Sequence, residues 1–177
     1  MNPLPLRPDL ARDLLLRKQR DQELRHEWAT SPRTARSPEV VDRANTEALR
    51  RIIAEHGWPG HSLVGPEAAD AAWLLAQHAD HDHSFQWECL ALLGQAARDG
   101  EATGQQLAYL TDRCRLNSQV PQIYGTQYIV RNGELALYDL EDPENLELRR
   151  ADVGLECFTE SDTRIRSAHP LTTPHPQ

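Results

Sequence analysis

The chain has 177 residues, 39% of them hydrophobic and 26% charged, which is the composition of one soluble globular domain with a single core. Its formal net charge of −8 is uneven, because residues 1–51 hold eleven Arg/Lys and eight Asp/Glu, and the remainder holds eight and nineteen. This acidic remainder argues against a nucleic-acid partner, which would require a basic stripe or patch.

Five helices are predicted in the first two thirds of the chain from apolar residues at helical spacing and from their start and stop signals. The third is apolar nearly all round, which marks it as a central, buried helix. Asp80 or Asp82 can cap the fourth, and Thr103 with Gln106 fits a capping box at the start of the fifth. The predicted helices cover about 8–28, 38–56, 66–76, 84–98 and 103–115.

The pattern changes after the fifth helix. Two strand-like runs, 127–131 and 134–138, flank Asn132-Gly133, the dipeptide that most strongly signals a β-hairpin. A short helix is expected after Asp142-Pro143, and 165–177 is expected to be a disordered tail. The sequence therefore predicts a mainly α fold: a single helical domain over 1–164, with about five to six helices and one hairpin near 127–138.

Cysteines and apolar runs indicate the compartment. The chain has three widely spaced cysteines, Cys89, Cys114 and Cys157, and no two of them form a CxxC motif. Neither a disulfide framework nor a zinc knuckle is therefore supported. The N-terminus lacks the apolar region of a signal peptide, and no apolar run approaches the ~20 residues of a membrane helix. We expect a cytoplasmic protein without a membrane partner.

A polar cluster, residues 77–83, follows directly on the buried third helix. If that helix continues through His78, the imidazole points into the core, where Asp80 could orient one of its ring nitrogens. An imidazole so placed can act as a general base near neutral pH. The alternative is a core histidine with a purely structural hydrogen bond.

The same cluster offers enough nitrogen and oxygen donors for a divalent metal ion. A loose match to the His…His-Asp…Asp pattern of helical phosphohydrolases would combine His61, His81-Asp82 and Asp112. In the competing interpretation, His81, Asp82 and His83 form a solvated corner and a helix cap. The preferred prediction has no metal ligands and no cofactor, with a divalent metal as the alternative.

Further polar residues on predicted helices could line a pocket. Asp21 and Arg25 are spaced as an i, i+4 ion pair, either on the surface or pointing inward to hold a site. Asp42 and Asn45 lie one turn apart beside an apolar stripe, where both have poor helix propensity. Arg113, which follows Asp112 directly, could clamp a carboxylate or phosphate. A structural ion pair or hydrogen bond is the alternative in each case.

A second dense polar element lies just before the hairpin. Pro121 and Gly125 fix an irregular backbone there, and side chains held on such a segment are suited to recognising a ligand. Tyr124 could donate a proton or stabilise an oxyanion. An ordinary edge strand is the alternative. The polar side chains of this segment are Gln122, Tyr124, Thr126 and Gln127.

Taken together, these motifs resemble an uncharacterised bacterial family, a domain of unknown function frequent in actinobacteria. The resemblance covers roughly residues 10 to 158 and implies a bacterial cytoplasmic protein, with no established activity to carry over. His78 and Asp80 match its pattern, whereas His81 and His83 do not, which weakens the metal interpretation. The motifs are Asp21-Gln22-x-x-Arg25, Asp42-x-x-Asn45, Gly57-Trp58-Pro59, Gln77-His78-Ala79-Asp80, Ala108-Tyr109-Leu110-x-Asp112-Arg113, Pro121-Gln122-x-Tyr124-Gly125-Thr126-Gln127 and Arg149-Arg150-x-x-Val153-Gly154-Leu155.

The sequence predicts a small metal-independent enzyme that performs hydrolysis, elimination or cyclisation on a small polar or anionic metabolite or peptide, with specialised metabolism as one setting for it. One alternative is a non-catalytic ligand- or protein-binding module, such as an immunity or accessory protein. The other is a metal-dependent hydrolase that uses the His78–His83 cluster. The predicted catalytic residues are His78, Asp80 and Tyr124, and the predicted substrate-binding residues are Arg25, Asn45, Asp112, Arg113, Gln122 and Gln127.

Overall fold

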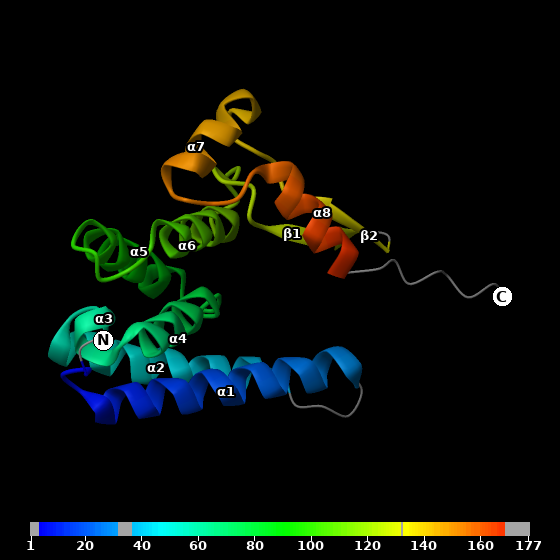
Figure 1. The fold of residues 1–177 in the computed structure, drawn as a ribbon. Helices are drawn as coiled ribbons and strands as arrows, with labels where there is room; N and C mark the ends of the chain where they lie inside the picture. Colours follow the sequence, from blue (N-terminus) through cyan, green and yellow to red (C-terminus); the bar gives the residue numbers. More distant parts are fainter. Residues whose placement is uncertain (1–3, 32–36, 132, 169–177) are drawn as a thin grey trace.

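The computed structural model describes residues 4–31, 37–131 and 133–168 (Figure 1). Within this part of the chain, the fold consists of eight α-helices, one 3-10 helix and one two-stranded sheet, which confirms the predicted mainly α class. In chain order the elements are α1 Pro8–Thr30, α2 Glu39–His56, α3 His61–Val64, α4 Pro66–Gln77, α5 His83–Arg98, α6 Gly104–Asn117, β1 Tyr128–Arg131, β2 Glu134–Leu137, η1 Pro143–Asn145, α7 Leu146–Asp152 and α8 Phe158–Ala168.

The helices are arranged in layers around α4 (Figure 1). Helices α1 and α2 form one layer, and α5 and α6 form another on the opposite side of α4. The predicted burial of α4 is confirmed: five of its alanines are almost inaccessible and permit close approach of the neighbouring helices. The core around them includes Leu14 of α1, Leu49 of α2, Phe85 of α5 and Leu110 of α6.

Several helix ends are determined by local side chains, as predicted. Pro66 begins α4, and the Asp82 carboxylate accepts a hydrogen bond from the Phe85 amide at the start of α5. At the start of α6, Thr103 and Gln106 form the predicted capping box. The Asp82 cap fixes the start of α5, and so one end of the polar turn that follows α4.

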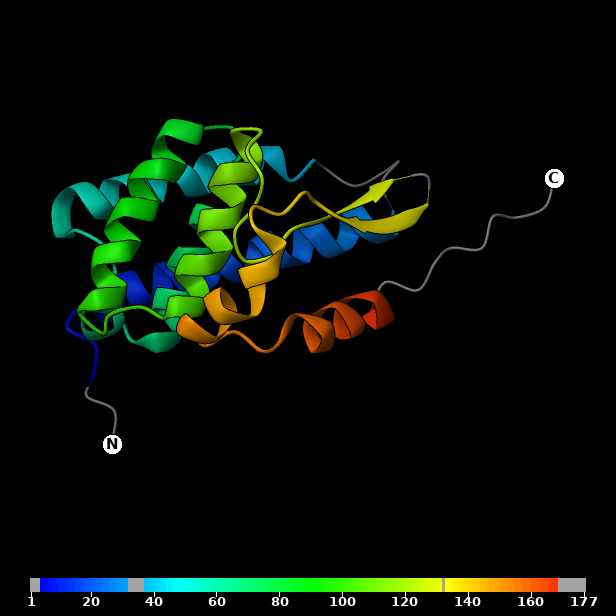
Figure 2. The ribbon, with the colours of Figure 1, turned by 90° about the horizontal axis from the view of Figure 1, so that it is seen from above.

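The predicted hairpin is present and is shorter by one residue at each outer end. Strands β1 and β2 pair antiparallel, with Tyr128 opposite Leu137 and Arg131 opposite Glu134. Gly133 has a positive φ of 81°, as a tight turn requires. The hairpin and α8 extend in the same direction as the C-terminal half of α1 (Figure 2).

Two helices were not predicted, and one of them corrects the predicted tail. Short α3 lies between Gly60 and Gly65 and has too few residues for a periodic pattern. Helix α8 runs to Ala168, so 165–168 are helical. It is joined to the distant hairpin by hydrogen bonds from the Tyr128 hydroxyl to Asp162 and from Arg166 to the Leu135 carbonyl. The rest of the expected tail lies outside the described residues. None of the described helices has the length and apolar character needed to cross a membrane.

Candidate functional site

The C-terminal end of α4 connects two polar clusters, because α4 stops at Gln77 and the chain turns through His78, Ala79 and Asp80. On one side is the Asp21 cluster, which consists of Asp21, Arg25, Asp42 and His78. On the other side is the Asp80 cluster, which consists of Asp80, Gln86, Arg113, Asn117 and Gln127.

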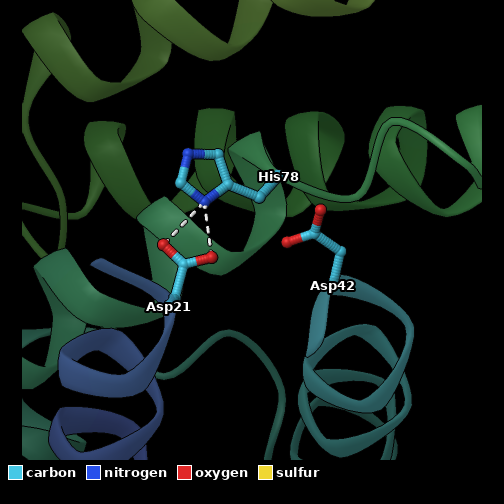
Figure 3. Close-up of side chains that lie close together, drawn as sticks. All are labelled: Asp21, Asp42 and His78. Atoms are coloured by element: carbon cyan, nitrogen blue, oxygen red, sulfur yellow. Dashed lines mark hydrogen bonds and ion pairs between the residues drawn. The ribbon is translucent and has the colours of Figure 1, made fainter. Parts of the chain in front are cut away.

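The Asp21 cluster is built by three helices (Figure 3). The carboxylate of Asp21, on α1, is 1% exposed, and both of its oxygens lie 3.0 Å from Nδ1 of His78. Nε of Arg25, one turn further along α1, lies 3.2 and 3.3 Å from the same two oxygens. Nη2 of Arg25 donates to Asp42 on α2 at 2.6 Å. Asp21 and Arg25 therefore form the predicted ion pair, and it points inward.

His78 is oriented by Asp21, and the prediction that Asp80 orients it is wrong. The imidazole belongs to the residue that caps the C-terminus of α4, and its side chain is 17% exposed. Its Nδ1 faces Asp21, whereas Nε2 has no hydrogen-bond partner in the described part of the chain. An imidazole held through one nitrogen and free at the other can exchange a proton with a bound molecule.

Charges around Asp21 keep its carboxylate ionised. Burial raises the pKa of Asp21, but the hydrogen bond and charge of His78, together with Gln22 and Arg25, outweigh it, so this pKa lies below its ordinary value. Burial likewise raises the pKa of Asp42, and here Arg25 offsets only part of the effect. An ionised Asp21 would stabilise a positive charge on the His78 ring.

Asn45, a predicted binding residue, lies on α2 one turn after Asp42. Its Oδ1 accepts a long hydrogen bond of 3.4 Å from Arg17, and its buried Nδ2 has no partner among the described residues. Asn45 also contributes to the wall of a groove of about 510 Å³ between α1 and α2. It therefore lies beside the Asp21 cluster, and no hydrogen bond joins it to His78 among the described residues.

The Asp80 cluster joins the turn after α4 to α5, α6 and the start of the hairpin. Arg113 holds Asp80 with two hydrogen bonds, from Nε at 2.9 Å and from Nη2 at 2.5 Å. Nη1 of the same guanidinium donates to Gln127 at 3.2 Å, and Asn117 donates to Asp80 at 2.8 Å. Two predicted binding residues, Arg113 and Gln127, are thus brought together at Asp80.

Asp112 and Gln122 hold the loop between α6 and β1. Asp112 is fully buried and accepts hydrogen bonds from the amides of Ile123, Tyr124 and Thr126. The buried amide of Gln122 donates to the carbonyls of Gln127 and Tyr138 and accepts from the Gln127 amide. Both side chains thus bind the backbone of the loop, and their role in binding a substrate stays a prediction.

Tyr124 is separated in function from His78 by this arrangement. Its amide binds Asp112, and the charges that act on its hydroxyl are those of Asp112, Arg149 and Asp152. Burial, the largest effect, raises the pKa of this hydroxyl. None of its interactions within the described residues involves His78.

The histidines and aspartates of the alternative metal pattern point to different partners. Asp82 caps α5 and pairs with Arg50, Asp80 pairs with Arg113, and Asp112 is enclosed by the loop. His61 lies near the carbonyl of Gly100. Among the described residues, the group whose ligand atoms come within 4.8 Å of one another is instead Asp21, Asp42 and His78.

Asp21 and Asp42 were not among the predicted site residues, although the sequence held a signal for each. Asp21 lies on the inward stripe of its helix, and Asp42 occupies a position with poor helix propensity. Their convergence on His78 depends on how α1, α2 and α4 pack.

The chain belongs to DUF6624, a family of unknown function, which matches residues 8–172. No curated protein and no solved structure shows significant similarity to the chain.

Proposed function

We propose that this member of DUF6624 is a small bacterial cytoplasmic enzyme that performs acid–base chemistry on a polar metabolite. His78 would exchange the proton through Nε2, and Asp21 would orient the ring through Nδ1. The observation that carries the proposal is the pair of 3.0 Å contacts from the buried Asp21 carboxylate to His78 Nδ1, which leave Nε2 without a partner among the described residues. General acid–base groups of this kind contribute about 10² to 10⁴ in rate.

The charges of the two clusters favour a neutral or cationic substrate over an anionic one. Arg25 is paired with Asp21 and Asp42, and Arg113 is paired with Asp80. Three carboxylates thus face two guanidinium groups, which leaves one negative charge in excess when His78 is neutral. Since each arginine is already paired, neither guanidinium is expected to bind a substrate anion.

Reaction type follows from what these residues can supply. His78 provides one proton acceptor or donor, and ionised Asp21 stabilises the imidazolium that forms after proton abstraction. Elimination and cyclisation need this kind of proton transfer, and hydrolysis can use it to activate water. Tyr124 is given no role, because its interactions among the described residues are with Asp112, Arg149 and Asp152 and none is with His78.

The test compares purified wild-type protein and variants in their action on a fractionated bacterial metabolite extract, followed by mass spectrometry. Wild type should convert at least one polar metabolite. His78→Ala should abolish the conversion, and Asp21→Asn should slow it by about 10² or more. The matched control is His83→Ala, which removes an exposed histidine at the start of α5 and should leave conversion unchanged.

Folding of each variant is checked by circular dichroism and thermal unfolding. A folded His78→Ala protein that still converts the metabolite would refute the acid–base role. Stoichiometric binding of a metabolite without conversion, unaffected by His78→Ala, would instead identify the protein as a binding module.

A further inference from the structure

The geometry points to a divalent-cation site formed by Asp21, Asp42 and His78, at the position that the guanidinium of Arg25 fills in this structure. This inference goes beyond the proposed function: it concerns a second ligand of the same residues and does not depend on turnover.

The three side chains supply a suitable set of donor atoms. One carboxylate oxygen from each aspartate and one ring nitrogen of His78 lie within 4.8 Å of one another, and they come from α1, α2 and the end of α4 (Figure 3). Ligand atoms bound about 2.1 Å from a common zinc ion lie roughly 3 to 4 Å apart, so a small contraction of the group suffices. Mixed carboxylate and imidazole ligands suit zinc, manganese and iron.

An internal cation already marks the position. Nε of Arg25 lies 3.1 Å from His78 Nδ1 and 3.2 Å from Asp21, and Nη2 lies 2.6 Å from Asp42. One positively charged group therefore contacts all three proposed ligands. The argument for a cation thus does not depend on counting acidic residues. The three side chains already surround one positively charged group, the guanidinium of Arg25.

The hydrogen-bond roles at His78 provide a second reason. Its Nδ1 faces acceptor oxygens of Asp21 at 3.0 Å and a donor N–H of Arg25 at 3.1 Å. A ring nitrogen is either a donor or an acceptor, so one of these contacts must be unfavourable in either tautomer. A metal ion in place of the guanidinium removes the conflict, because the Nδ1 lone pair and both carboxylates then face the same cation.

The guanidinium of Arg25 can move out of the proposed cation site. Its side chain is 33% exposed, the largest fraction in the Asp21 cluster, so the guanidinium can move into water when the aspartates bind a metal ion. Arg25 is then a competitor for the site, and its removal should raise the affinity for cations. The cation-bound state excludes the acid–base state, because Nδ1 cannot both donate its proton to Asp21 and bind a metal ion.

The experiment measures metal binding directly. Protein freed of metal with EDTA is titrated with Zn²⁺, Mn²⁺ and Co²⁺ by calorimetry, and the visible absorption of Co²⁺ reports its coordination. Wild type should bind one equivalent, and Arg25→Ala should bind it about tenfold more tightly or better, since a neighbouring positive charge is lost. The matched control Arg43→Ala removes an exposed arginine of α2 and should bind as wild type does.

Ligand variants then test the assignment. Asp42→Asn and His78→Gln should each weaken binding about tenfold or more and change the Co²⁺ spectrum. If Asp42→Asn does not fold, His78→Gln on the exposed side of the cluster serves the same purpose. Absence of one-equivalent binding to wild type, even when Arg25→Ala binds, would overturn the proposal and make Arg25 a permanent counter-ion. Binding that survives His78→Gln unchanged would also overturn it. Neither result depends on conversion of a metabolite, so the acid–base proposal stands or falls separately.

Discussion

The hydroxyl of Thr126 donates a 2.9 Å hydrogen bond to the carboxylate of Asp112, which sits beneath the loop between α6 and the hairpin. The same carboxylate accepts from three backbone amides of the loop. Asp112 therefore acts as an internal template on which this irregular segment is folded, and it determines where Gln127 meets Arg113.

Removal of this template should be costly. Asp112→Ala leaves three loop amides, one buried and two half-buried, without their acceptor, so we expect the free energy of unfolding to fall by about 3 kcal/mol or more. Urea denaturation measures the loss. The control is Asp139→Ala, at an exposed carboxylate after β2, for which a change within about 0.5 kcal/mol is expected. A loss at Asp112 no larger than the control's would show that water replaces the carboxylate without cost.

A glycine in the same loop provides the second prediction. Gly125 has a positive φ of 67°, and a Cβ there would lie 3.2 Å from the Phe158 ring. Gly100 has a similar φ of 75°, with nothing within 4 Å of its Cβ position. Both alanine variants should lose about 1 kcal/mol to backbone strain, and Gly125→Ala should lose about 1 kcal/mol more from the ring contact. Equal losses in thermal unfolding would mean that Phe158 moves aside freely.

The sequence predicted the elements that local residues determine. The starts of α4, α5 and α6 could be located because their signals act within one helical turn: Pro66, Asp82 and the Thr103 capping box. The hydrogen-bond partner of His78 could not be predicted from the sequence, for two reasons. Helix α4 ends at Gln77, so helical phase no longer places Asp80, which turns toward Arg113. The actual partner, Asp21, is 57 residues away and meets His78 only through the packing of α1 on α4.

The contact between α8 and the hairpin should depend on pH. Asp162 accepts from Arg166 and from the Tyr128 hydroxyl, and Arg166 in particular holds the pKa of this carboxyl below its ordinary value. A lowered folded-state pKa stabilises the fold above the unfolded value of about 3.9, and the contribution disappears as the pH falls through the folded value. Wild type should therefore be more stable than Asp162→Asn at pH 7, and the difference should shrink below about pH 3.9 and vanish once the carboxyl is protonated in both states. A difference in the urea midpoint that is independent of pH would contradict this.

The ion pair between Arg113 and Asp80 should contribute more than an ordinary surface pair. Its two-pronged geometry is reinforced by Asn117, although the two side chains are 30% and 41% exposed, so solvent screens part of the attraction. A double-mutant cycle with Asp80→Ala and Arg113→Ala should give a coupling energy of about 1 kcal/mol. The comparison pair is Glu39 and Arg43 on α2, both 60% exposed, where a coupling below about 0.5 kcal/mol is expected. Equal couplings would contradict the expectation that the two-pronged geometry and Asn117 strengthen the pair of Asp80 and Arg113.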